Sequence, residues 1–336
     1  MFALVSSAHA VVLVVDYTYD TGNFFSGNVA AKAALEAAAL DISNAITGTL
    51  GPVTTDVYAS TNGGTTATFD WSIDFNNPTT NATESLATFN AAANQITLFA
   101  GMRSLSGSTL GVGGPAGVGL SIGASSSGNP ATEWAGAVAG AETLSNAAML
   151  RGGGPVIGTL SDSMTFGATA NYSLGYGALF GTLSLDSDVG TVWHYDHTTS
   201  VGGGENDFYS VSLHEMLHAI GVGTSQTWTS KTSGTDWTGT NVINLNGSGT
   251  GLIVAGGGHI AEGTMSTRIS DGLAQEVVMD PTITVGTRKS LTALDLAFLQ
   301  DLGFTTIAVP EPSRVLLLLF GAVGVMLTRR RQCMPV

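Results

Sequence analysis

The sequence feature that most constrains the fold is the pentapeptide HEMLH at positions 214–218. Histidines four positions apart lie on one face of an α-helix of about 3.6 residues per turn, so both imidazoles can bind one metal ion. Glu215 is turned about 100° from His214, where it can contact a water on that ion without being a ligand. The pattern predicts a helix over residues 207–221 that carries His214 and His218 as metal ligands.

The chemistry that this pattern favours is hydrolysis by a zinc-bound water. Zinc acts as a Lewis acid and lowers the pKa of its water to about 7, which makes a nucleophile at neutral pH. Glu215 would accept the proton of the water and pass it to the leaving group. A catalytic zinc site needs three protein ligands and one open position, so a third ligand is required.

Extended by Gly221, the motif resembles that of the metzincin clan of zinc metallopeptidases, in which the chain turns sharply at this glycine. In that clan the third ligand normally follows three residues after the glycine, where this chain has Thr224. The chain is therefore more similar to leishmanolysin-like zincins, whose third histidine lies on a later loop. The resemblance implies that His259 is the third zinc ligand and that Met279 belongs to a Met-turn beneath the zinc.

Other residues compete for the third position. His194 and His197 have H-x-x-H spacing, which can hold zinc from a loop, and a water or the carboxylate of Glu262 is a further alternative. A separate hypothesis is that some aspartates bind structural Ca²⁺. The alternative is that these carboxylates are solvated loop residues. The candidates for calcium are Asp16, Asp20, Asp186, Asp188 and Asp196.

Composition excludes several classes of protein. The net charge is −14 with only 11 Lys and Arg, so no basic surface is expected to bind nucleic acid. The single cysteine, Cys333, rules out an intrachain disulfide. Stability is therefore expected from packing, from bound metal or from both.

Both ends of the chain have the pattern of targeting signals. Residues 1–10 end in Ala-His-Ala, which fits the remnant of a signal peptide. Residues 309–332 contain Pro-Glu-Pro, an apolar run and three arginines, an order that resembles the PEP-CTERM sorting signal of Gram-negative bacteria. The resemblance implies export, transient anchoring in the inner membrane, cleavage by an exosortase-type enzyme and a final place at the cell surface or outside the cell.

Between these signals, residues 11–308 are predicted to form one catalytic domain with subdomains 11–223 and 224–308. Its expected fold is α/β (α+β) of the zincin kind, a twisted mixed sheet with an active-site helix and a small C-terminal subdomain. Residues 101–154 are rich in Gly, Ser and Ala, and we predict loops with weak strands there. Strands are predicted at 11–15, 68–75, 96–100 and 182–185, and further helices at 28–46 and 292–302, the last with a capping box of Thr292 and Asp295.

These observations predict a zinc endopeptidase acting on protein or peptide substrates, with Glu215 as general base. One alternative is a surface or adhesion protein of the extracellular matrix that retains an inactive zincin scaffold. A second is a zinc hydrolase that cleaves another kind of bond. An intact Glu215 argues against the scaffold, because a binding protein has no need of a general base.

Overall fold

The computed structural model describes residues 11–308, and its centre is a mixed four-stranded sheet of order β1-β5-β10-β6. Three of its strands are parallel, and the edge strand β6 is antiparallel to β10. The predicted α/β (α+β) class is thus confirmed. The strands are β1 (Val12–Asp16), β5 (Gln95–Arg103), β10 (Phe180–Asp186) and β6 (Gly111–Pro115).

Two helices, α2 (Val29–Ala45) and α4 (Phe208–Ala219), pack against each other and against this sheet. Both begin at a side-chain cap: Asn28 accepts a hydrogen bond from Ala31 N, and Asp207 accepts one from Ser210 N. The predicted helices at 28–46 and 207–221 are confirmed. A short helix, α1 (Phe24–Gly27), precedes them.

A second antiparallel sheet contains the strand predicted at 68–75. That strand, β3 (Thr65–Asn76), is longer than predicted and alternates as expected, with Phe69, Trp71, Ile73 and Phe75 all buried. β3 pairs on one side with β2 (Val57–Asn62) and β4 (Thr83–Leu86), and on the other side with β7 (Gly117–Ser126).

The prediction of loops with weak strands over residues 101–154 was right about strands but missed a long helix. This region contains β6, β7 and a helix of 20 residues, α3 (Pro130–Met149). The helix has no wide apolar stripe, because it packs through small residues: a Cβ added at Gly140 would lie 2.1 Å from Ser60 Oγ. Its start signals, Asn129 as cap and proline at the first position, are present in the sequence.

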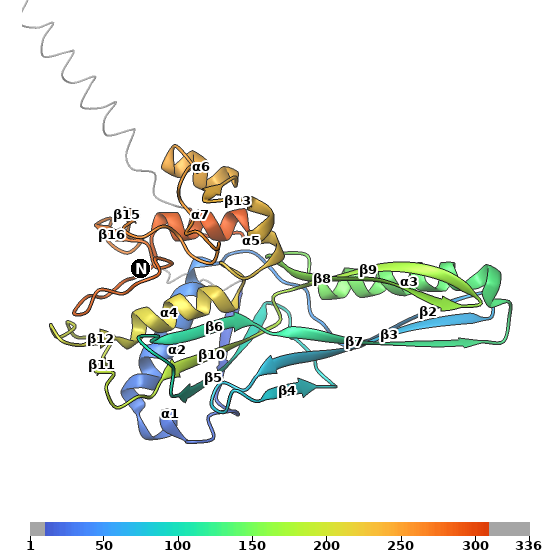
Figure 1. Cartoon of the computed structure of the whole chain (residues 1–336), viewed down its shortest axis with the longest axis horizontal. Coiled ribbons are helices and arrows are strands. Elements are labelled where there is room, and N and C mark those ends of the chain that lie inside the picture. The colour runs from blue at the N-terminus through green and yellow to red at the C-terminus, as the bar shows by residue number, and fades with distance from the viewer. Residues whose placement is uncertain (1–10, 309–336) are drawn as a thin grey trace, which may run out of the picture.

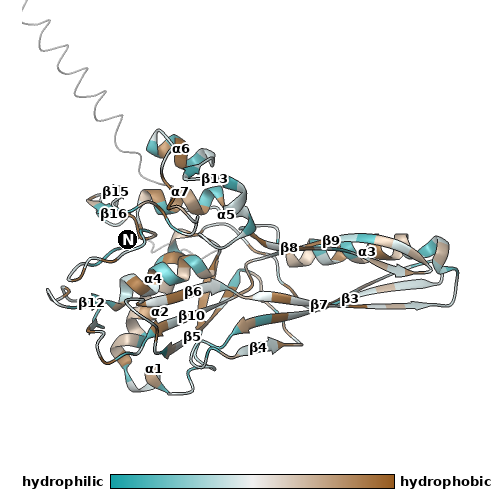
Figure 2. Ribbon diagram, in the orientation of Figure 1, coloured by the Kyte–Doolittle hydropathy of each residue, from teal (hydrophilic) through white to brown (hydrophobic). Residues whose placement is uncertain are grey.

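Together these elements form an arm that extends to one side of the central sheet (Figure 1). It consists of the outer parts of β2, β3 and β7, helix α3, and a hairpin of β8 (Val156–Phe166) and β9 (Ala168–Gly177). A hydrophobic core of its own includes Trp71 and Trp134. The outer ends of β3 and β7 are pale in Figure 2, since they are built of Thr, Gly, Ala and Ser.

The C-terminal part covers α4 on the side away from the sheet (Figure 1). Its closing helix, α7 (Ala293–Asp301), begins at the predicted capping box of Thr292 and Asp295, which is confirmed. Phe298 of this helix packs on Trp228 and Trp237. The remaining elements are β11 (Trp193–His194), β12 (Asn206–Asp207), α5 (Gln226–Lys231), β13 (Thr232–Ser233), β14 (Asp236–Trp237), α6 (Thr240–Asn246), β15 (Met265–Thr267) and β16 (Ala274–Glu276).

The two predicted targeting signals, at 1–10 and 309–332, lie outside the described residues. Within residues 11–308, no helix combines the length and the apolar character that a membrane span requires.

Arg151 joins the arm to the central sheet, and its loss is expected to destabilise the protein. Its buried guanidinium donates to four carbonyl oxygens, those of Gly51, Ala92, Gln95 and Ala178. An Arg151→Met substitution removes a charged donor from each of these acceptors, so we expect the free energy of unfolding to fall by about 3 kcal/mol. Chemical denaturation would measure this, with Arg268→Met as the control because Arg268 pairs only with Asp271 near the surface. Equal stability of the two variants would contradict the assignment.

Candidate metal centre

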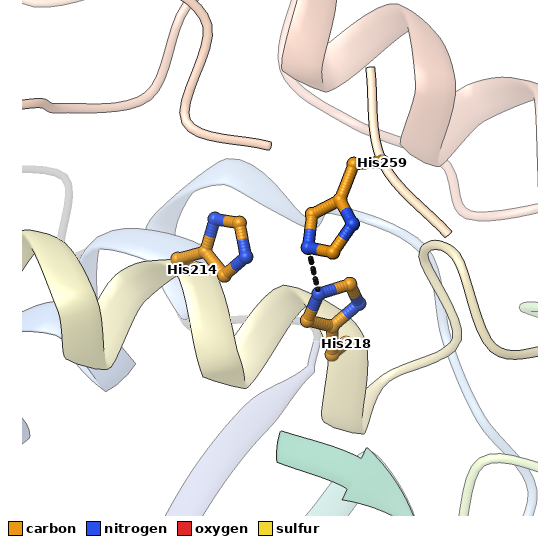
Figure 3. A group of neighbouring side chains, drawn as sticks. All are labelled: His214, His218 and His259. Carbon is orange, nitrogen blue, oxygen red and sulfur yellow. Dashed lines mark hydrogen bonds between the residues drawn. The ribbon is translucent and has the colours of Figure 1, made fainter. Parts of the chain in front are cut away.

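Three histidines converge at the surface of helix α4 that faces the C-terminal part (Figure 3). His214 and His218 come from successive turns of α4, and His259 reaches them from a loop after α6. One ligand atom from each lies within 4.8 Å of the others. In residues 11–308 this is the only group of three or more His, Cys, Asp or Glu that could hold an ion.

Backbone carbonyls orient the two helix histidines. His214 Nδ1 lies 2.8 Å from Val278 O, and His218 Nδ1 lies 2.8 Å from Val222 O. A carbonyl can only accept, so each Nδ1 donates its proton, and each Nε2 carries a lone pair that can bind a metal.

The spacing of His218 and His259 is close to that of two zinc ligands. His218 Nε2 and His259 Nε2 are 3.1 Å apart. Two nitrogens bound to a tetrahedral zinc at about 2.0–2.1 Å would be separated by about 3.3 Å. Because His218 donates Nδ1–H to Val222 O, its Nε2 accepts the hydrogen bond from His259 Nε2, and a bound cation would take the place of that proton.

Burial keeps these histidines in their neutral form. Desolvation lowers the pKa of His214 to about 3 and that of His218 to about 4, and it also lowers the pKa of His259. Neutral imidazole is the form that binds a metal, so no proton has to leave the site at neutral pH.

Glu215 is buried beside the histidines and contacts strand β6. Desolvation raises its pKa to about 8, and a hydrogen bond from the Gly113 backbone opposes that rise. A Cβ added at Gly111 would lie 2.7 Å from Glu215 Oε1, so the strand passes directly against the carboxylate. The side chain is therefore a base in a site of low polarity, where a nearby cation would favour its ionised form.

A cleft of about 1000 Å³ opens over this group. His214, Glu215 and His259 line it, together with Leu110 and Gly111 at the start of β6. The volume suits a ligand larger than one amino acid, and the cleft gives solvent access to His214, Glu215 and His259.

The turn after α4 is built as the sequence suggested. Gly221 has φ of 114°, in the region that favours glycine, and its N–H bonds to His218 O. Thr224, at the position of the usual metzincin ligand, donates its hydroxyl to His218 O instead. The chain thus ends its helix here without a third ligand.

His259 lies on a loop that two contacts hold over α4. Trp228 Nε1 donates to Gly257 O, and Ile260 N donates to Met279 O. Met279 is buried and follows Val278, the residue that orients His214. The predicted Met-turn segment therefore adjoins the site.

The competing ligands lie elsewhere. His194 Nδ1 is 2.8 Å from Glu205 Oε2, and the ring of His197 stacks on Tyr209. Glu262 accepts a hydrogen bond from Thr282. None of the three belongs to the group of possible metal ligands.

The five aspartates considered for calcium form no group of three that could hold an ion within residues 11–308. The alternative, that all five aspartates are solvated loop residues, does not hold for every one of them either. Asp20 and Asp186 are buried and accept hydrogen bonds from Phe25 N and Leu105 N, respectively. Asp16 and Asp196 accept from nearby loop amides.

Some residues of the site could not be identified from sequence patterns. Lys289 lines the cleft, is buried, and pairs with Glu276 at 3.1 Å and Asp280 at 3.7 Å. The carbonyls of Val222 and Val278 and the backbone of β6 were missed too. No local pattern marks them, because backbone direction and long-range pairing depend on the fold.

The fold and site define a mixed α/β protein with a partly buried three-histidine centre and an adjacent glutamate. No protein-family model matches the chain, and no curated protein or solved structure is significantly similar to it.

Gly223 controls how closely the His259 loop approaches α4. Its φ is 75°, and an added Cβ would lie 2.0 Å from Gly258 O and 3.0 Å from His218 Cε1. Gly223→Ala is therefore expected to displace the His259 loop and to weaken zinc binding by about tenfold, as displacement of ligand supports does elsewhere. Zinc titration would measure this against Gly234→Ala, which also has positive φ but open space around it. Equal affinities of the two variants would contradict the proposed role.

Proposed function

We propose that this chain is an exported zinc-dependent endopeptidase of the zincin type. The observation that supports it most is the convergence of His214, His218 and His259 in one cleft, with Glu215 beside them. The donor set is three neutral nitrogens with carbonyl partners behind two of them, which suits Zn²⁺.

When bound, zinc would supply a Lewis acid and a water of lowered pKa. The role of Glu215 follows from its position beside the histidines: its carboxylate would act as the general base and return the proton to the leaving amine. Burial raises the pKa of Glu215 to about 8, so a bound cation would be needed to keep the carboxylate ionised and able to accept the proton at neutral pH. His214 and His218 remain neutral ligands, held by Val278 O and Val222 O.

Strand β6 would position the substrate. It is the edge of the central sheet, pairs with β10 on one side only, and adjoins both Glu215 and the cleft. An extended peptide can add to such a free edge through main-chain hydrogen bonds. This mode of binding favours a polypeptide substrate over a small ester or amide.

The proposed route of the protein follows from its two terminal signals. We infer secretion, transient anchoring in the inner membrane through residues 309–332, cleavage by an exosortase-type enzyme and release to the surface of a Gram-negative cell. Zincin peptidases with this route would act on proteins outside the cytoplasm.

Zinc analysis combined with a casein assay tests the proposal. Purified protein should contain about one equivalent of zinc and hydrolyse casein. A chelator should abolish hydrolysis, and added Zn²⁺ should restore it. Zinc without hydrolysis of casein or peptides would instead favour the inactive scaffold, and hydrolysis of esters alone would favour a hydrolase of another class.

A further inference from the structure

Arg103 is a cation without a protein partner. Its Nε atom is buried and has no hydrogen-bond partner, and its guanidinium forms no ion pair within 4.0 Å among residues 11–308. The other arginines of the described chain are all paired: Arg151 with carbonyls, Arg268 with Asp271 and Arg288 with Asp207. A buried guanidinium nitrogen is normally satisfied, so the orphan Nε points to a missing ligand, while the rest of the partly exposed group faces the pocket.

Arg103 lies on the face of the central sheet that is opposite to the metal centre. On strand β5 the side chains of Leu98, Ala100 and Met102 join the core formed with α2 and α4. Side chains alternate along a strand, so Arg103 shares the other face with Phe99, which belongs to the core of the arm.

A pocket of about 390 Å³ receives this side chain. It lies where the central sheet meets the ends of β3 and β4, and it shares no lining residue with the cleft over the histidines. β6 separates the two spaces: Gly113 lines the pocket and also contacts Glu215.

The pocket walls carry polar groups that are free to bind a ligand. Within the described chain, the side chains of Asn76, Asn81 and Thr182 form no hydrogen bond, although all three line the pocket. Asp74 lines it as well, with Oδ1 held by the hydroxyl of Ser85 at 2.6 Å. The walls thus offer one cation, one anion and neutral donors and acceptors.

We propose that this pocket binds a small carboxylate that also carries a hydroxyl or ammonium donor. The planar guanidinium of Arg103 would bind the carboxylate through two parallel hydrogen bonds. Asp74 would accept the donor of the ligand, and its negative charge would disfavour a multiply charged anion such as phosphate. The volume lies at the lower end of ligand pockets, which suits a hydroxy acid or an amino acid.

Ligand-observed NMR and calorimetry on the full chain test the proposal, with lactate, gluconate and L-serine as probes. At least one probe should bind, and more tightly than acetate or inorganic phosphate. Arg103→Gln should weaken that binding by about 10- to 100-fold, the range expected for charge-assisted hydrogen bonds. Arg268→Gln, which removes the same charge far along the chain, should bind as wild type does.

Asp74→Asn provides an independent test, because it keeps Arg103. This variant should reverse the preference for the carboxylate probes over phosphate, so that phosphate binds more tightly than in wild type. Because Arg103 has no protein partner, Arg103→Gln should also keep the melting temperature of the unliganded protein. The proposal is overturned if no carboxylate probe binds, if Arg103→Gln binds as wild type does, if that variant melts at a clearly lower temperature, or if Asp74→Asn leaves the preference unchanged.

Discussion

Replacement of Glu215 by glutamine is expected to lower kcat/KM for casein-derived peptides by about 10³-fold, the contribution typical of a general base. The amide has nearly the same shape as the carboxylate and can still meet the Gly113 backbone, but it cannot accept the proton of the water. The three histidines are untouched, so zinc content should stay at about one equivalent.

Paired measurements of zinc and of peptide hydrolysis on the same samples would check this result. Glu36→Gln is the matched control, since Glu36 lies on the exposed side of α2 and pairs with Lys32. Hydrolysis that survives in Glu215→Gln would remove Glu215 from the chemistry. Loss of zinc together with activity would show that the residue acts on the metal site and not on the water.

Replacement of His259 by alanine is expected to weaken zinc binding by more than about 100-fold. Loss of an outer hydrogen-bond partner of a ligand already costs about 10- to 100-fold, and His259 would be a direct ligand. Two histidines of α4 would remain, and two protein ligands do not complete a catalytic zinc site. Hydrolysis should therefore fall with zinc occupancy.

Competition with a chromophoric chelator would measure the affinity of this variant. The control is His197→Ala, which removes an imidazole that stacks on Tyr209 outside the metal group. The melting temperature of the metal-free protein should be similar in both variants, because the His259 side chain makes no carbonyl contact that the fold requires. If His259→Ala keeps its zinc while His197→Ala loses it, the third ligand has been misassigned.

Much of the candidate site could be predicted from sequence because its information is local. The spacing of His214 and His218 on one helix turn needs only the geometry of the helix, and Asn28, Asp207 and Thr292 mark helix starts through hydrogen bonds within three residues. The alternation of β3 is local in the same way. His259 was reached by resemblance and not by spacing, and the structure places it in the group.

The helix α3 shows where local reasoning fails. Its small residues pack closely on β2 and β9, so the reason for its stability lies in strands far along the chain. The same holds for Arg151, whose four acceptors come from three separate segments.

The sequence by itself therefore determined the helix that carries His214 and His218, the capping box of Thr292 and Asp295, the alternating strand β3 and the residue types of the site, since each depends on neighbours within about one helical turn. Only the tertiary structure decided the distance from His259 to His218, the orientation of both helix histidines by Val222 and Val278, and the pocket around Arg103. These depend on how β6, α4 and the C-terminal loops pack together, and packing joins residues that no local pattern relates.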